Sequence, residues 1–303
     1  MRAAVAIESL KDNPYFAERV KEIADEVTYL PARPDHDELR DLLGQYDLLV
    51  IGARERITAG MLRDAPVRTR IVGTLSVGTD HLDLPALKEA GIYVERCPTA
   101  NVRSVAEHAL ALLFALSKEL KWGDRLVADG KSRSGLPSLP FELSGRTLGL
   151  IGYGNIGSTL GTLAAALGMR VVATSRTRQD GGDGEVTFGT LEHILSESHL
   201  VSISVPLTQE TRGLVNSTTL ASLRAGAILV NTSRAEVVDE QAVRAALDSG
   251  RLAGYGGDYD HADPDLTERP NVLITPHVAG ITVESNDRLD NELIDRLVAH
   301  LKG

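Results

Sequence analysis

Three polar side chains in the C-terminal part of the chain together provide the chemistry that reduction of a carbonyl group requires. They are Arg234, Asp263 and His277, and each follows a short apolar stretch that is typical of a buried strand. A guanidinium holds a carboxylate through two parallel hydrogen bonds and polarises a neighbouring carbonyl. An imidazole donates a proton near neutral pH, and a carboxylate beside it would orient it and hold its proton. Because ligands bind at the carboxyl ends of strands in open α/β sheets, we predict a catalytic site here.

Other histidines are weaker candidates for the proton donor. His261 lies two residues before Asp263 and is the alternative acid–base group, although histidines in loops are usually solvated. His81 and His108 have no clear proton-transfer role, and we expect them to be hydrogen-bonding scaffold.

A glycine-rich turn carries the G-x-G-x-x-G spacing of a dinucleotide-binding loop, between an apolar strand and a helical pattern at 159–167. Gly152 permits the tight turn, Gly154 lets the backbone approach a pyrophosphate, and Gly157 allows close packing of helix on strand. The amides at the helix N-terminus then face the phosphates. An ordinary strand–helix turn is the alternative. The predicted loop residues are Gly152, Tyr153, Gly154, Asn155, Ile156 and Gly157.

The residues after the next predicted strand bear on the choice between NAD and NADP. Ser175, Arg176, Thr177 and Arg178 follow the strand 170–174. An NAD-specific loop carries Asp or Glu here, to accept hydrogen bonds from the ribose hydroxyls. A carboxylate would repel a 2′-phosphate, whereas Ser and Arg would bind it. The sequence therefore predicts NADP(H) as the preferred cofactor, with NAD(H) as the second choice; arginines that are merely exposed in a loop are the alternative interpretation.

Apolar runs alternate with helical patterns along almost the whole chain, which predicts an α/β protein with parallel sheets in two Rossmann-like units. In the first part, the predicted strands are 3–7, 48–51 and 71–75, and the predicted helices are 15–26 and 37–43. The strands of the second series are predicted at 147–151, 170–174, 200–204, 227–231, 254–258 and 272–274.

A long helical pattern over 102–122 joins the two series. It begins near Asn101, with Ser104 and Glu107 spaced as in a capping box, and a Gly- and Ser-rich loop follows at 130–144. The last predicted helix, 284–301, comes after the second series is complete. By pattern alone it either closes the second unit or returns to the first.

Length and composition exclude several classes of protein. With 303 residues, 43% hydrophobic and 24% charged, the chain has enough apolar material for two cores. A net charge of −10 repels phosphate backbones, so we expect no nucleic-acid partner. The single cysteine, Cys97, allows neither an intrachain disulfide nor a cysteine zinc site, and we predict no metal. Apolar runs are too short to span a membrane, and residues 1–10 do not resemble a signal peptide, so we expect a cytoplasmic protein without a membrane partner.

Six sequence motifs occur in an order that is specific for one family. They are SVGTDHL at 76–82, SVAEH at 104–108, the glycine turn at 152–157, PLT…T…LVN within 206–216, VNTSR…VDE within 230–240, and TPH at 275–277. Over nearly the whole chain, the sequence resembles the D-isomer-specific 2-hydroxyacid dehydrogenases, the group that contains phosphoglycerate dehydrogenase and glyoxylate/hydroxypyruvate reductase.

The resemblance implies an architecture in which the last helix returns to the first unit. A substrate-binding domain would comprise residues 1–98 and 281–303, and a dinucleotide-binding domain would comprise 99–280. The substrate, a small 2-keto or 2-hydroxy acid, would bind in the cleft between them. The resemblance also implies a homodimer built around the dinucleotide-binding domain and the helix after Asn101.

The resemblance also implies roles for individual residues. Arg234 would bind the carboxylate and carbonyl of the substrate, and His277 would be the acid–base group. The loop of Ser76, Val77 and Gly78 would hold the carboxylate through backbone amides. The further residues expected to contact the cofactor are Val205, Pro206, Thr211, Thr232, Ser233, Asp258, which would face the nicotinamide carboxamide, and Gly280.

Two arginines outside these motifs, Arg54 and Arg56, follow the predicted strand 48–51 at the ligand-binding edge of its sheet. Either could contact an anionic tail of the substrate, and we take Arg54 as the candidate. A surface arginine without a ligand is an equally good interpretation.

The chain departs from the family pattern at two positions. The family's catalytic Glu, directly before a Pro, is here Asp263, whose shorter arm is expected to lengthen the contact with His277. The family's Gly after the catalytic Arg is here Ala235, which is expected to restrict the backbone.

These observations favour an NADPH-dependent reductase that converts glyoxylate, hydroxypyruvate or a similar 2-keto acid into the D-2-hydroxy acid. Oxidation of formate or phosphite on the same scaffold is one alternative, although relatives that oxidise formate carry an amide where this chain has Asp263. A dinucleotide-sensing, corepressor-like interaction protein is the other alternative.

Overall fold

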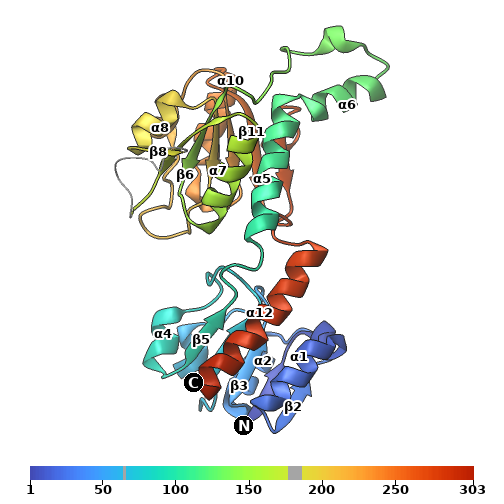
Figure 1. Cartoon of the computed structure of the whole chain (residues 1–303), viewed down its shortest axis with the longest axis vertical. Helices are drawn as coiled ribbons and strands as arrows, with labels where there is room; N and C mark the ends of the chain where they lie inside the picture. The colour runs from blue at the N-terminus through green and yellow to red at the C-terminus, as the bar shows by residue number, and fades with distance from the viewer. Residues whose placement is uncertain (64–65, 177–185) are drawn as a thin grey trace. The chain divides into compact units, whose positions relative to one another are not determined.

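The computed structural model describes residues 1–63, 66–176 and 186–303, and the chain separates into two compact units (Figure 1). The first unit comprises Met1–Asn101 and Thr282–Gly303, and the second comprises Val102–Ile281. Both are built from parallel sheets with helices, which confirms the predicted fold class. No helix in the described part of the chain combines the length and the apolar character needed to cross a membrane.

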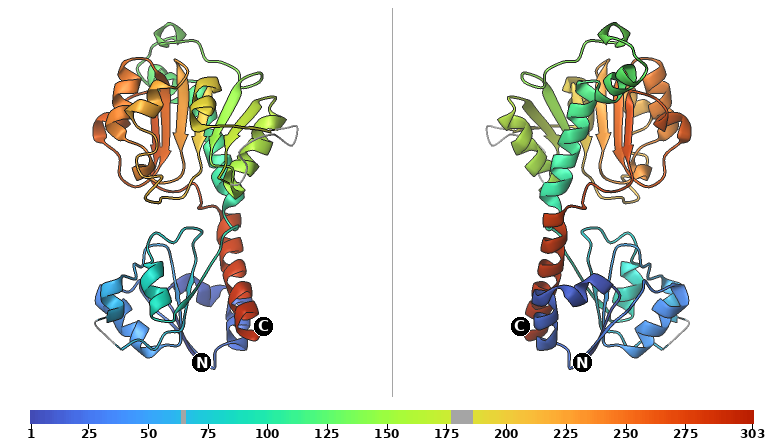
Figure 2. Two further views of the ribbon diagram at one scale, coloured as in Figure 1. Left: turned by 90° about the vertical axis from the view of Figure 1, so that its left-hand side faces the viewer. Right: turned by 90° about the vertical axis from the view of Figure 1, so that its right-hand side faces the viewer.

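The first unit contains a parallel sheet of five strands within the described residues, in the order β2-β1-β3-β4-β5. Its strands are β1 (Arg2–Val5), β2 (Glu26–Tyr29), β3 (Leu48–Ile51), β4 (Ile71–Thr74) and β5 (Tyr93–Arg96). Its helices are η1 (Glu8–Asp12), α1 (Pro14–Arg19), η2 (Val20–Glu22), α2 (His36–Gln45), α3 (Ala59–Arg63), α4 (Leu84–Glu89) and α12 (Val283–Lys302). The final helix α12 packs beside α1 and against β4 and β5, so it returns to the first unit, as the resemblance implies (Figures 1 and 2).

The second unit contains a parallel sheet whose seven described strands have the order β12-β11-β10-β9-β6-β7-β8. The strands are β6 (Thr147–Ile151), β7 (Arg170–Thr174), β8 (Val186–Phe188), β9 (Leu200–Ile203), β10 (Ala227–Asn231), β11 (Leu252–Asp258) and β12 (Val272–Thr275). The helices are α5 (Val102–Ser117), α6 (Leu120–Ala128), η3 (Arg133–Gly135), α7 (Asn155–Ala166), α8 (Leu191–Glu197), α9 (Ser217–Ala221), η4 (Ala235–Val237), α10 (Glu240–Asp248) and α11 (Pro264–Thr267). The order reverses between β6 and β9, which is where doubly wound sheets bind ligands.

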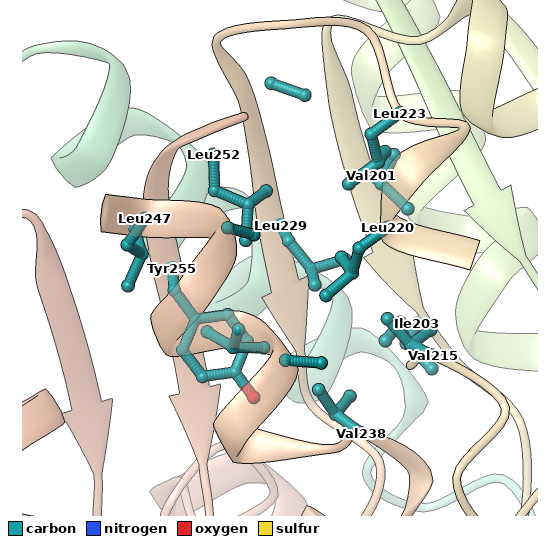
Figure 3. Close-up of a cluster of buried hydrophobic side chains, with 14 of the residues drawn as sticks. Val201, Ile203, Val215, Leu220, Leu223, Leu229, Val238, Leu247, Leu252 and Tyr255 are labelled. Atoms are coloured by element: carbon teal, nitrogen blue, oxygen red, sulfur yellow. The ribbon is translucent and has the colours of Figure 1, made fainter. Parts of the chain in front are cut away.

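The sheet of the second unit is covered by a hydrophobic cluster on each of its two faces, and its strands therefore carry apolar side chains on both sides. On β10, Leu229 packs into one cluster, together with Leu220 of α9 (Figure 3), whereas Ile228 and Val230 pack into the other, which includes Leu113 of α5. Successive side chains of a strand point to opposite faces, so a strand buried on both sides has a continuous apolar sequence.

The predicted central strands are confirmed, and the strands that the sequence missed lie at or near sheet edges. The predicted strands 48–51, 147–151, 170–174 and 227–231 match β3, β6, β7 and β10. The missed strands are β2, β5 and β8, each at an edge of its sheet. Edge strands are half solvated, and the sequences of β2 (EVTY) and β5 (YVER) mix charged with apolar residues. They therefore give no apolar run.

Two helix predictions were wrong in detail. The predicted helix 102–122 is interrupted after Ser117. The next helix, α6, begins at Leu120, and its N-cap residue Glu119 has a left-handed backbone (φ 54°). The proposed capping box is absent, because α5 begins at Val102 and Ser104 is buried inside the helix, while Glu107 pairs with Arg103. The predicted helix 15–26 also ends early, since Glu26 opens β2.

Candidate active site

The glycine turn lies between β6 and α7, next to the point where the strand order reverses. Gly152 has a φ of +98°, and a Cβ placed there would lie 2.7 Å from the carbonyl oxygen of Ser204. A Cβ on Gly157 would lie 2.2 Å from the carbonyl oxygen of Gly152. Gly154 is different: it precedes α7 at φ −88° and a Cβ there would meet nothing within 4 Å. Two glycines are thus needed by the fold itself, whereas Gly154 leaves open space above the helix N-terminus.

That open space fits a dinucleotide phosphate. The N-cap of α7 is Gly154, which has no side chain to cover the first amides of the helix. Asn155 is exposed and Ile156 half-buried at the same helix start, and Tyr153 packs edge-on against Phe188 at 5.2 Å between ring centroids. The Gly152 amide donates to the Thr174 hydroxyl (3.1 Å), which ties the loop to the end of β7.

The residues that follow β7 have the polarity expected for a ribose phosphate site. Ser175 is half-buried and Arg176 is exposed. The predicted Thr177 and Arg178 lie outside the described residues. Within the described part of this segment, no carboxylate side chain follows the strand. The pKa of Glu210 in a neighbouring loop is lowered, mainly by a hydrogen bond with the Thr208 hydroxyl and least by the charge of Arg176.

Two buried hydroxyls line the same sheet edge without a hydrogen-bond partner. They belong to Ser204, which follows β9, and Thr232, which follows β10. Buried polar groups without partners are costly and mark sites where a ligand completes the hydrogen bonding. The adjoining loop is folded by Thr211, whose hydroxyl donates to the carbonyl of Pro206 (2.6 Å). Val205 packs against Gly152 through its side chain, and the edge therefore offers polar atoms and shape for a dinucleotide.

Arg234 stands on a turn that Asn231 holds rigid. The Asn231 amide nitrogen donates to the carbonyl of Arg234 (2.8 Å), and the Asn231 side-chain oxygen accepts from the amide of Ser233 (3.0 Å). The Ser233 hydroxyl donates back to Ile203 of β9 (3.1 Å). Ala235 opens η4 with a negative φ, so the Ala in place of the family's Gly causes no backbone strain, and the expected restriction has no effect.

His277 is held in a left-handed backbone conformation (φ 53°) by a buried aspartate. Asp258 is 2% exposed, and its carboxylate accepts from the Thr275 hydroxyl (2.6 Å) and from the amides of Val278 (2.9 Å) and Ala279 (2.8 Å). His108 shares a hydrogen bond with the same Thr275 hydroxyl (2.9 Å), which confirms the scaffold role expected of it. The turn projects the exposed His277 beyond the carboxyl end of β12. The predicted contact between Asp258 and the carboxamide stays a prediction.

The Asp263 carboxylate is engaged by groups other than His277. It caps α11 by accepting from the amide of Asp265 (2.9 Å) and forms an ion pair with Arg244 of α10. Within the described residues, no hydrogen bond or ion pair joins Asp263 to His277, and the expected longer contact between them stays a prediction. The Asp side chain is shorter than that of the family's Glu, so its carboxylate stays close to the start of α11, where it pairs with Arg244. His261, the alternative acid–base group, is exposed in the preceding loop.

The loop predicted to hold a carboxylate lies in the first unit. The Ser76 hydroxyl donates to the carbonyl of Gly78 (2.7 Å) and shapes the loop, while the amides of Val77 and Gly78 donate to no group among the described residues. Two such amides suit a carboxylate. His81 hydrogen-bonds the Thr74 hydroxyl (2.9 Å), again as scaffold. Arg54, at the neighbouring strand end, is exposed.

The sequence did not single out Arg244. Helical periodicity alone places it on the same face of α10 as Glu240, four residues earlier, which is a common spacing for a surface ion pair. Only the structure shows that this face meets the loop before α11, where Asp263 lies. A basic residue at that spacing was the available signal, and it is weak.

Residues 110–279 match the family described as D-isomer specific 2-hydroxyacid dehydrogenase, NAD binding domain. A glyoxylate reductase of Pyrococcus furiosus is 34% identical over 279 residues, which cover 88% of this chain and 83% of that protein. The chain belongs to the D-isomer-specific 2-hydroxyacid dehydrogenase family. Because the matched residues lie within the second unit, that unit carries the dinucleotide-binding domain of the family.

Two further proteins are similar to this chain, one in sequence and one in structure. A hydroxypyruvate reductase of Thermotoga maritima is 32% identical over 275 residues, covering 88% of this chain and 89% of that protein. A solved structure of an acyclic imino acid reductase in complex with NADPH and D-Arg has a TM-score of 0.90 at 26% identity, covering 100% of this chain and 97% of that one.

Proposed function

We propose that this dehydrogenase reduces a short 2-keto acid of the glyoxylate or hydroxypyruvate type to the D-2-hydroxy acid. The observation that carries the proposal is the turn at His277, which Asp258 holds in the same sheet edge that bears Arg234. The relatives support the substrate class, since those named above are a glyoxylate reductase and a hydroxypyruvate reductase. Neither alternative, formate or phosphite oxidation or a corepressor, is favoured by them.

Each polar residue then has a defined part in the reaction. A bound nicotinamide dinucleotide supplies the hydride for the keto carbon. Arg234 binds the substrate carboxylate and polarises the carbonyl, and the amides of Val77 and Gly78 in the first unit stay the further carboxylate ligands predicted from the sequence. His277 donates a proton to the carbonyl oxygen as negative charge builds on it, and the carboxylate of Asp263 favours the protonated form of His277.

The preferred cofactor in this proposal is NADP(H). Support comes from Ser175 and Arg176 after β7, where a carboxylate would select NAD. Titration of the protein with NADPH and NADH, followed by fluorescence, measures the preference directly. Ser175→Asp combined with Arg176→Ala should shift the ratio of dissociation constants toward NADH, and tighter binding of NADH by the unmodified protein would overturn this part of the proposal.

The assembly in this proposal is a homodimer built on α5, α6 and the segment that follows α6. In Figures 1 and 2, α6 and this segment project from the body of the second unit. They expose large apolar side chains: Leu120 is 56%, Val127 77% and Leu139 88% exposed. Exposed apolar groups of this kind mark a protein interface. Light scattering after size exclusion should give twice the mass of one chain, and Leu139→Asp with Val127→Asp should give the monomer.

A substrate panel tests the function. The purified protein is mixed with NADPH or NADH and with glyoxylate, hydroxypyruvate or pyruvate, and loss of the reduced cofactor is followed at 340 nm. We expect turnover with at least one of these acids. Turnover only with formate or phosphite plus the oxidised cofactor, or only with a keto acid plus an amine, would replace the proposed reaction. Tight dinucleotide binding with no turnover of any substrate would favour the corepressor class.

A further inference from the structure

A polar network runs through the apolar cluster beneath the catalytic edge. Tyr255 of β11 is fully buried among apolar side chains (Figure 3), and its hydroxyl lies 2.9 Å from that of Tyr259, which is 6% exposed. The side chain of Asn231, the residue that holds the Arg234 turn, lies near the Tyr255 hydroxyl, and that of Glu240 of α10 lies near the Tyr259 hydroxyl. Burial raises the pKa of Tyr255 to about 12, so its hydroxyl stays protonated near neutral pH.

Arg244 lies beside this network on α10 and pairs with Asp263. It lies four residues after Glu240 on α10, and its head forms an ion pair with Asp263 and lies 3.6 Å from Asp265. The Nε atom of Arg244 and the Oε1 atom of Glu240 are both buried without a hydrogen-bond partner. The terminal nitrogens of Arg244 are therefore committed to the start of α11 and not to Glu240.

The two oxygens of Asp263 are both occupied as a result. Oδ1 accepts from the amide of Asp265, and Oδ2 faces the guanidinium of Arg244. A carboxylate that is held by a cap and by an ion pair keeps both its position and its charge. We propose that Arg244 is a positioning residue of the reaction: it holds the Asp263 carboxylate at the start of α11 and limits how much of its negative charge acts on His277. This inference rests on the function proposed above.

The charges around Asp263 and His277 determine the direction of the effect. Arg244 faces Asp263 from α10, with Glu240 near Arg244 on the same helix, and Asp265 lies beside Asp263 on α11. His261 and Asp260 precede it in the loop. On the other side, the turn of His277 packs on Asp258, and His108 approaches from α5.

Removing the Arg244 cation should raise the pKa of both Asp263 and His277, although one group is an acid and the other a base. Without the cation, the carboxyl of Asp263 loses the partner that favours ionisation, so its pKa rises. His277 loses a nearby positive charge and gains the unshared charge of Asp263, so its pKa also rises. Asp263→Asn removes the negative charge and must lower the pKa of His277. The two variants therefore shift the alkaline limb of reduction in opposite directions.

The experiment measures the imidazole titration of His277 by NMR and the pH profile of kcat in the same set of variants. The protein carries its bound cofactor and is used in the oligomeric state in which it purifies. His277→Ala assigns the resonance. We expect Arg244→Met to move the His277 titration and the alkaline limb of kcat to higher pH, and Asp263→Asn to move both to lower pH. Arg244→Lys, which keeps the charge, should stay near the original value, and Arg244→Gln, which keeps a hydrogen-bonding group without the charge, should behave like Arg244→Met.

The matched control is Arg269→Met. Arg269, which follows α11, forms an ion pair with Asp248 at the end of α10 (2.7 Å) and is 29% exposed, compared with 35% for Arg244; its ion-pair partner is Asp248 and not Asp263. It should leave the His277 titration unchanged. If Arg244→Met lowers kcat equally at every pH and leaves the titration unchanged, Arg244 is only structural and the inference fails. If Asp263→Asn and His277→Ala also keep full activity, the proposed function fails with it.

Discussion

At the scale of single residues, the site depends on one strained backbone. His277 has a positive φ, which costs a non-glycine residue of order 1 kcal/mol or more and persists only where the surroundings enforce it. The enforcing group is Asp258, which takes three donors from the turn, one of them the Thr275 hydroxyl that also meets His108. The backbone conformation that positions His277 is thus a property of Asp258 and Thr275 as much as of the histidine.

Replacing Thr275 with Val should loosen this turn. The change removes the 2.6 Å hydrogen bond to Asp258 and leaves a buried carboxylate with one donor fewer. We expect the free energy of unfolding to fall by about 1–3 kcal/mol and kcat to fall roughly tenfold or more, because His277 is then less well aligned. Chemical denaturation and steady-state kinetics measure the two effects. Thr275→Ser keeps the hydroxyl and is the control; equal losses in both variants would show that the hydrogen bond of the hydroxyl is not what holds the turn.

At the scale of elements, the turn from β6 to α7 separates what the fold needs from what a ligand needs. A side chain at Gly157 would meet the carbonyl oxygen of Gly152 and push the helix away from the strand, and a side chain at Gly152 would meet Ser204 and Val205. Gly154 has neither a close neighbour nor a left-handed backbone. A glycine that the fold does not require is best explained by the approach of a ligand to the backbone.

This distinction predicts different outcomes for two small substitutions. Gly154→Ala should change the free energy of unfolding by less than about 0.5 kcal/mol while weakening binding of either dinucleotide by about tenfold or more. Gly157→Ala should destabilise the second unit by about 1–3 kcal/mol, because its Cβ would lie 2.2 Å from a carbonyl oxygen. Calorimetric titration and thermal unfolding distinguish the two. Unchanged cofactor affinity in Gly154→Ala would place the phosphates elsewhere.

In the first unit, Asp47 links the segments that lead into β1, β3 and β4. Its carboxylate accepts from Arg68 (2.8 and 3.2 Å) and from the amide of Arg2 at the start of β1 (2.8 Å). These interactions, the Arg68 guanidinium first, lower the pKa of Asp47 from 3.8 to about 2.

Because the pKa of Asp47 is lower in the folded state, its stabilisation is complete above pH ~4 and is lost as the pH falls toward ~2. Asp47→Asn should therefore cost about 1 kcal/mol near neutral pH, a modest value because the pair is partly solvated, and progressively less below pH ~4. Urea titrations of both proteins across this range give the difference. A difference that grows as the pH falls would mean that the carboxylate is not what stabilises these strands.

At the scale of the whole molecule, the central strands, the glycine turn and the family motifs were predictable because each follows from residues close together in the sequence. The edge strands β2, β5 and β8 were not, since half-solvated strands have no apolar pattern. Nor was the partner of Asp263: Arg244 lies 19 positions away, and a surface-like spacing on α10 gives no sign that α10 meets the loop before α11. The left-handed His277 was equally invisible, because no glycine marks it.

The central claim is that His277 donates the proton during reduction of a 2-keto acid, and the most direct measurement compares kcat for the unmodified protein, His277→Ala and His261→Ala on the best acid of the panel. Cofactor affinity is measured in parallel as the control for folding. We predict that His277→Ala loses on the order of 10²–10³-fold in kcat with NADPH affinity nearly unchanged, while His261→Ala keeps its activity. Near-complete activity in His277→Ala, or a larger loss in His261→Ala, would contradict the account.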